Sequence, residues 1–183
     1  ATQGMRFTDA YDRKKEARLS AVLDALERGD VALVSEAGMP LLADPGYELV
    51  QAVLAREGTI DVVPGPTALL AALTLSGLSP DPFVFLGFAP RRSAARRTLF
   101  AEYVSDARTL VLYESPNRLL DTLSDARAVL GNRQVVVACE LTKLYEEVSR
   151  GDLDSVRTTL SEEEPRGEYV VVLGGVANDG QTG

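Results

Sequence analysis

The sequence predicts an α/β protein of two domains, and three patterns in its 183 residues support this prediction. Short apolar runs rich in valine alternate with longer segments whose apolar residues recur at helical spacing. Glycine ends several of the helical segments, and the apolar runs end in polar loops. The turn SPDP at 79–82 separates a first domain, 1–80, from a second, 83–175, and residues 176–183 form an expected disordered tail.

The first domain begins with an amphipathic segment and continues with two β-α units. The runs VALVS and TIDVV contain no polar alternation, which is typical of parallel strands that are buried on both faces. The expected elements are, in order, a helix over 12–28, a strand over 31–35, a helix over 47–57, a strand over 59–63 and a helix over 67–76.

Two strands are too few for the parallel sheet of this first domain. Such a sheet buries too little apolar surface to be stable alone, and no strand precedes the first helix. We therefore expect the sheet to be incomplete here, and truncation at the N-terminus is favoured over strands supplied by a partner.

The second domain repeats the alternation and is the more complete of the two. Its strands are again valine-rich, and Asp152 is the expected N-cap of its last helix. The expected elements are strands over 83–88, 108–115, 134–140, 144–151 and 167–175, with helices over 93–105, 117–130 and 152–161.

Composition excludes several kinds of chemistry. The chain has no histidine, so Ser/His/Asp and Cys/His nucleophilic sites and His-based zinc sites cannot be built from it. Its lone cysteine, Cys139, sits in an apolar run and is expected to be a buried structural thiol. No apolar run approaches the roughly 20 residues that span a bilayer, and no signal-peptide pattern occurs, so we expect a cytoplasmic protein without membrane or metal.

Two loops at strand ends point to one small ligand. The apolar run 31–35 ends in a loop with glycines, prolines and carboxylates, and the second run ends in PGPT before a helix. In open α/β sheets, small molecules bind at this edge. Gly38 and Pro66 give the two loops a bent, open backbone, although 36–46 also fits a tight connection without a ligand.

Six blocks in order resemble one family. They are SEAGMPLLADPGYELV, VVPGPTALLAALTLSGL, FVFLGFAPRR, TLVLYESPNRLL, VACELTKLYEEVSRG and GEYVVVLGG. The chain is similar to the ribosomal small-subunit RNA cytidine 2′-O-methyltransferases, a branch of the tetrapyrrole methylase superfamily. It departs from them at Met39, where the family has a small hydroxyl residue, and it lacks the strand and glycine-containing loop with which they begin.

The resemblance implies a two-domain tetrapyrrole methylase-like fold, S-adenosylmethionine (SAM) as methyl donor, and a homodimer that acts on 16S rRNA in the small ribosomal subunit. The start of the helix near Thr67 fits a bound carboxylate and also fits ordinary capping. With the two loop residues named above, the implied donor-binding set is Gly38, Met39, Leu42, Pro66, Ala68 and Leu69.

Methyl transfer to a ribose hydroxyl needs an acceptor for the departing proton. Glu114, Glu140 and Lys143 lie at carboxyl ends of expected strands and are the catalytic candidates. A local ion pair between Glu140 and Lys143, and a salt bridge from Arg118 to Glu114, are the structural alternatives.

Arginines concentrate near the start of the second domain of this acidic chain, whose net charge is −8. A local basic patch in such a protein favours contact with phosphate, and pairing with Glu102 and Asp106 is the structural alternative. The expected RNA-binding residues are Arg91, Arg92, Arg96, Arg97 and Arg118.

The expected function is therefore SAM-dependent 2′-O-methylation of a cytidine in 16S rRNA. Within the superfamily, the alternative is a C-methyltransferase for a corrin or sirohaem precursor. From a different class, the alternative is an inactive fragment that dimerises without turning over.

Overall fold

The computed structural model describes residues 15–176, and the chain divides into two compact units, Ala1–Pro66 and Thr67–Gly183. The part of the first expected helix over 12–14 and the expected tail over 177–183 lie outside the described residues. Each unit has a hydrophobic core of its own.

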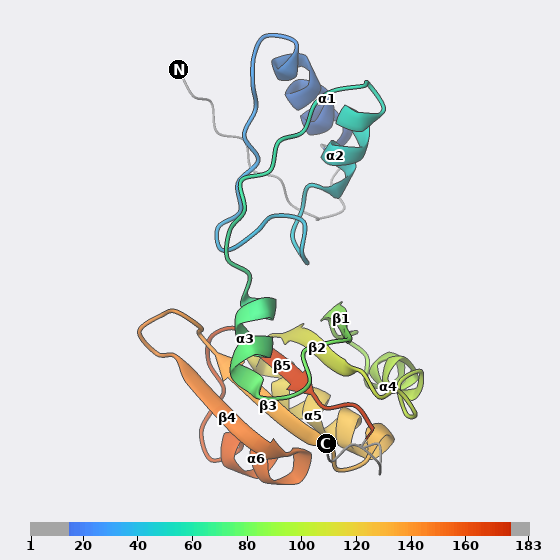
Figure 1. The fold of residues 1–183 in the computed structure, drawn as a ribbon, viewed down its shortest axis with the longest axis vertical. Coiled ribbons are helices and arrows are strands. Elements are labelled where there is room, and N and C mark those ends of the chain that lie inside the picture. The colour runs from blue at the N-terminus through green and yellow to red at the C-terminus, as the bar shows by residue number, and fades with distance from the viewer. Residues whose placement is uncertain (1–14, 177–183) are drawn as a thin grey trace. The chain divides into compact units, whose positions relative to one another are not determined.

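The first unit is built on two helices, α1 (Lys15–Leu26) and α2 (Tyr47–Leu54). Leucine and valine at helical spacing place Val22 and Leu23 of α1 against Leu49 of α2, and all three side chains are buried. The remainder of this unit between 27 and 66 is irregular backbone (Figure 1).

The two strands expected over 31–35 and 59–63 do not form. The described part of this unit contains no strand with which they could pair, and a strand is held by hydrogen bonds to a neighbour. Val34 is 81% exposed and Val63 is 87% exposed, so these apolar runs lie at the surface instead of in a sheet. The prediction of a parallel sheet in the first domain is thus corrected to a helical pair with extended, exposed segments.

The second unit contains a five-stranded sheet in the order β1-β2-β5-β3-β4 (Figure 1). β1 and β2 are parallel, whereas β5 runs antiparallel to both of its neighbours and β4 is antiparallel to β3. The carboxyl ends of β1, β2 and β3 therefore lie at one edge of the sheet. The strand bounds are β1 Phe83–Phe88, β2 Thr109–Glu114, β3 Gln134–Cys139, β4 Glu147–Asp152 and β5 Tyr169–Leu173.

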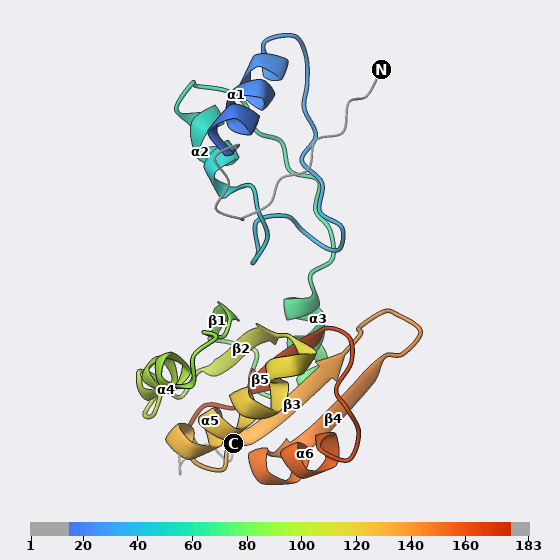
Figure 2. The same cartoon turned by 180° about the vertical axis from the view of Figure 1, so that it is seen from behind.

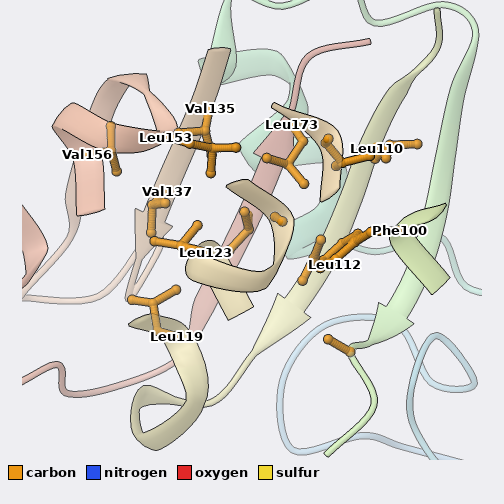
Figure 3. Close-up of a cluster of buried hydrophobic side chains, with 14 of the residues drawn as sticks. Phe100, Leu110, Leu112, Leu119, Leu123, Val135, Val137, Leu153, Val156 and Leu173 are labelled. Atoms are coloured by element: carbon orange, nitrogen blue, oxygen red, sulfur yellow. The ribbon is translucent and has the colours of Figure 1, made fainter. Parts of the chain in front are cut away.

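Helices cover both faces of this sheet (Figures 1 and 2). On one face, α3 packs against strand residues such as Val111 and Val172. On the other, Phe100, Leu123 and Leu153 from α4, α5 and α6 meet the inner residues of the strands (Figure 3). The bounds are α3 Ala68–Ser76, α4 Ser93–Ala101, the 3-10 turn η1 Pro116–Arg118, α5 Leu119–Leu130 and α6 Leu153–Leu160.

The fold class α/β is confirmed, and each element expected in the second domain occurs with small shifts at its ends. Asp152 caps α6 as expected, through a hydrogen bond of 2.8 Å from the N–H of Ser155. The division between units falls at Pro66, earlier in the chain than the turn at 79–82, because Leu69, Ala72 and Leu73 of α3 are buried against the sheet.

Candidate functional site

A hydrogen bond joins the two glycine-containing loops of the first unit. The N–H of Met39 donates to the carbonyl oxygen of Pro66 over 3.1 Å. Gly38 has a φ of 71°, and a Cβ there would lie 3.2 Å from the Pro66 oxygen. On the other side, a Cβ at Gly65 would lie 3.3 Å from the sulfur of Met39. The expectation that Gly38 and Pro66 lie together is therefore met by the backbone itself.

The longer loop is braced internally. The hydroxyl of Ser35 donates a hydrogen bond to the carboxylate of Asp44, and Gly46 leaves room for the side chain of Leu33. Leu42 stays 41% exposed, and Gly38 and Pro66 are also exposed. The loop pair thus presents open main chain and the exposed apolar side chains of Leu41 and Leu42.

The start of α3 uses its free N–H groups within the protein. Thr67 caps the helix by accepting from the N–H of Leu70 over 3.2 Å, and the hydroxyl of Tyr113 accepts from the N–H of Leu69 over 3.2 Å. Ala68 is exposed, but the side chain of Leu69 is buried in the core. Ordinary capping therefore accounts for this helix start, and of the two predicted donor contacts on α3 only Ala68 is accessible.

Glu114, at the end of β2, forms an ion pair with Arg118. Their oxygen and nitrogen lie 2.6 Å apart, and the Glu114 side chain has no exposed surface. Thr122 donates to the other Glu114 oxygen over 2.7 Å, and the N–H of Ser115 donates over 2.8 Å. The carboxylate is fully engaged, so the structural alternative holds for Glu114, and a catalytic role for it is not supported.

Glu140 and Lys143 lie in the loop between β3 and β4 and contact Glu168, which directly precedes β5. The Lys143 ammonium is 3.1 Å from Glu140 and 2.8 Å from Glu168, and the N–H of Glu168 donates to Glu140 over 2.8 Å. The N–H of Glu168 and then Lys143 lower the pKa of Glu140, whereas the two carboxylates, Glu168 first, raise the pKa of Lys143. Lys143 is therefore an ammonium at neutral pH and cannot accept a proton.

The topology separates these two acidic groups. Tyr169 of β5 pairs with Glu114 of β2 on one side and with Cys139 of β3 on the other. Glu140 follows Cys139 directly. Since adjacent strands are about 4.8 Å apart, one intervening strand puts roughly 10 Å between the two backbone positions. Of the three predicted catalytic residues, Glu114 is therefore buried apart from the other two, Glu140 and Lys143, which belong to one ion cluster.

Asp125 of α5 organises the arginine-rich helix α4. It accepts hydrogen bonds from Ser93 and Arg97 over 2.8 Å and from Arg96 over 2.9 Å. Burial raises the pKa of Asp125, but the hydrogen bonds from Arg97, Ser93 and Arg96 outweigh it, and the net shift is downward. Arg96 is 3% exposed, so its predicted contact with RNA is corrected to a structural role.

Two arginines hold three successive carbonyl oxygens of the turn before α4. Arg118 donates to Ala89 over 2.9 Å, and Arg96 donates to Pro90 over 3.3 Å and to Arg91 over 2.9 Å. The side chains of Arg91 and Arg92 are exposed on this fixed turn and form no ion pair with any residue that the structure describes. They do not use the sequence-predicted partners, since Asp106 pairs with Arg108.

An open groove lies beside this turn. It gathers residues from the ends of β1 and β2, and only two of them, Arg91 and Arg118, were among the predicted site residues. Sequence reasoning missed Phe88 because it belongs to the apolar run of β1, and it missed Ser115 and Asn117 because they are uncharged. The lining residues are Phe88, Ala89, Pro90, Arg91, Ser115, Asn117 and Arg118.

Residues 2–157 match the family model of the Tetrapyrrole (Corrin/Porphyrin) Methylases. The chain therefore belongs to the tetrapyrrole methylase family. Within it, the chain is 43% identical over 176 residues to the "Ribosomal RNA small subunit methyltransferase I" of Mycobacterium tuberculosis, with 95% of this chain and 61% of the relative covered. It is 42% identical over 166 residues to the protein of the same name from Thermotoga maritima, with 90% and 74% covered.

Solved structures support the fold. The methyltransferase CobJ has a TM-score of 0.66 at 20% identity, with 90% of this chain and 72% of that chain covered. Uroporphyrin-III C-methyl transferase from Thermus thermophilus, complexed with S-adenosyl homocysteine, has a TM-score of 0.60 at 21% identity, with 88% and 74% covered. The chain spans about 61% of the length of the first curated relatives.

Within residues 15–176, no helix is both long and apolar enough to cross a membrane. Nor does that part of the chain bring three or more acidic or cysteine side chains together as metal ligands.

Proposed function

We propose that this chain belongs to a SAM-dependent methyltransferase that modifies the ribose 2′-hydroxyl of a cytidine in 16S rRNA. The observation that carries the proposal is the 42–43% identity to relatives named ribosomal RNA small subunit methyltransferase I. The fixed turn that presents Arg91 and Arg92 supports an RNA substrate, because exposed guanidiniums pair with phosphate.

The loop pair of the first unit fits an adenosyl donor. Gly38, Met39, Leu42 and Pro66 would hold it through main-chain groups and the exposed Leu42 side chain. The N–H of Met39 is already donated to Pro66, so the carbonyl of Met39, not its N–H, is available to a ligand. When bound, the donor supplies an electrophilic methyl group on a sulfonium.

The remaining chemistry is the transfer of one proton from the ribose hydroxyl. Among the three predicted catalytic residues we assign this step to Glu140. Its Oε1 accepts from Lys143 and Glu168, whereas its Oε2 accepts no hydrogen bond from the described residues, and the side chain is 21% exposed. Lys143 then acts by orienting this carboxylate.

The rival within the family is C-methylation of a tetrapyrrole precursor. The solved structures with this fold bear such names, but their identity of about 20% supports the fold alone. We also propose that the protein is a homodimer, an expectation that follows from the family resemblance and that analytical ultracentrifugation tests.

The deciding experiment is methyl transfer from radiolabelled SAM. Isolated 30S subunits lacking this modification and uroporphyrinogen III are offered separately, and labelled RNA is digested to nucleosides. Label in 2′-O-methylcytidine supports the proposal, and label in the porphyrin alone reverses it. Calorimetry with S-adenosylhomocysteine separates an inactive fragment, which gives no heat, from an enzyme that has the wrong substrate.

A further inference from the structure

A bulge near the end of β1 redirects one aromatic side chain. Phe85 pairs with Val111 of β2 and Phe88 pairs with Tyr113, so three steps along β1 match two along β2. Gly87 lies between them with a φ of 65°, a backbone conformation that suits glycine. The extra residue puts Phe88 on the same face as Phe85 and Tyr113.

The Phe88 ring packs against another aromatic ring and is still largely exposed to solvent. Its centroid is 5.7 Å from that of Tyr113, which in turn lies 5.0 Å from Phe85. Even so, Phe88 is 52% exposed and lines the groove with Arg91 and Arg118. A large aromatic surface that is held in place yet left in water has the properties of a stacking platform.

The charges around this ring favour a phosphate. Within residues 15–176, the arginines at positions 91, 92, 96, 97 and 118 form ion pairs with two carboxylates, Asp125 and Glu114, which leaves three positive charges. The rest of the chain is acidic, so a polyanion meets attraction chiefly at this patch. Arg91 lines the same groove as the ring and forms no ion pair among the described residues, so its charge is available to a phosphate there.

We propose that this groove binds one unpaired nucleotide of an RNA strand, with the base stacked on Phe88 and the phosphate beside Arg91. The inference rests on the proposed function and adds a site for the single-stranded part of the substrate. An unpaired base is required, since a base in a duplex has no face to offer to the ring.

The chain contains no tryptophan, which makes a direct test available. In Phe88→Trp the new indole is the sole tryptophan, and a stacked base quenches its emission. The matched control is Tyr145→Trp, because Tyr145 is 78% exposed in the loop between β3 and β4, across the sheet from β1 (Figure 1). Each variant is titrated with a ten-nucleotide single-stranded RNA, with the same RNA as a duplex, and with S-adenosylhomocysteine.

We expect the single strand to quench Phe88→Trp and to leave Tyr145→Trp unchanged. In the otherwise natural chain, Phe88→Leu weakens single-strand binding about tenfold, as measured by anisotropy of labelled RNA. Arg91→Ala reduces the slope of log K against log salt by about 0.7, whereas Arg157→Ala, which removes an exposed charge on α6, leaves the slope unchanged.

Three results overturn the inference: equal quenching in both tryptophan variants, quenching of Phe88→Trp by duplex or by S-adenosylhomocysteine as strongly as by single strand, and no RNA binding at all. The methyl-transfer assay keeps the two proposals apart. Methyl transfer to RNA without quenching confined to Phe88→Trp would reject only the nucleotide site. Quenching confined to Phe88→Trp without methyl transfer would reject only the proposed enzymatic function.

Discussion

The N–H of Met39 and the carbonyl oxygen of Pro66 lie 3.1 Å apart and hold two loops of the first unit together. The pairing uses main-chain atoms, so it does not depend on the methionine side chain that distinguishes this chain from the family pattern. It depends instead on Gly38, whose positive φ turns the next N–H toward Pro66.

Gly38→Ala is expected to weaken this contact. An alanine at a φ of 71° costs about 1–2 kcal/mol, and its Cβ would lie 3.2 Å from the Pro66 oxygen. Urea unfolding should show the loss, and calorimetry should show weaker binding of S-adenosylhomocysteine. The control is Gly29→Ala, where a Cβ meets nothing within 4 Å and stability should change by less than about 0.5 kcal/mol. Equal losses of stability and of binding in the two variants would show that the contact between the loops is not the cause.

Asp125→Asn is expected to loosen α4. The change leaves the buried Arg96 without its counter-charge, which typically costs about 3–5 kcal/mol. Chemical denaturation measures this loss. Asp154→Asn is the matched control, since its pair with Arg127 is 40–45% exposed and is worth less than about 1 kcal/mol. A small effect in both variants would show that Arg96 finds other partners.

The lowered pKa of Asp125 predicts that the stability of the fold depends on pH. The pKa of Asp125 in the folded protein is below its ordinary value of 3.8, so its ionised form stabilises the fold. This contribution is complete above about pH 4 to 5 and is lost as pH falls through the lowered pKa. The difference in stability between the natural chain and Asp125→Asn should therefore shrink below pH 3.8. A constant difference from pH 7 to pH 2 would contradict the assignment.

Glu140→Gln tests the proton acceptor. The amide oxygen can still accept from Glu168, so the loop keeps its shape while the basic carboxylate is lost. We expect methyl transfer to fall about 100-fold, with little change in amide exchange at Thr142 and Lys143. Glu168→Gln, which weakens the other contact of Lys143, should retain most of the activity. If both variants lose activity together with exchange protection, Glu140 only orders the loop.

The second unit was predictable because its patterns are local. Valine-rich runs, helical spacing and caps such as Asp152 each act within a few residues, and they fixed every element of the sheet. The strand order was not accessible in this way, since β5 pairs with β2 and β3 from distant parts of the sequence. In the first unit the prediction of strands over 31–35 and 59–63 was wrong. A strand needs a neighbouring strand to pair with, and an apolar run in the sequence does not guarantee one.

The partners of the candidate residues were less predictable than their place in the second unit. Glu114 and Glu140 lie at the ends of β2 and β3, yet Glu114 and Arg96 are buried with partners of opposite charge. Burial of a charged residue depends on a distant partner, here Asp125 for Arg96, and composition carries no sign of it. Phe88 was missed because its direction is set by the bulge at Gly87, which shifts the pairing of β1 with β2.

The position of β5 also bears on how the molecule forms during synthesis. Of the five strands in this sheet it is the last to be made, yet it occupies the middle of the sheet. Until residues 169–173 leave the ribosomal tunnel, the nascent chain holds only two separate ribbons, β1–β2 and β3–β4, whose inner edges are unpaired. Exposed edges of this kind invite aggregation, so a trigger-factor-type chaperone or rapid release should raise the yield of soluble protein.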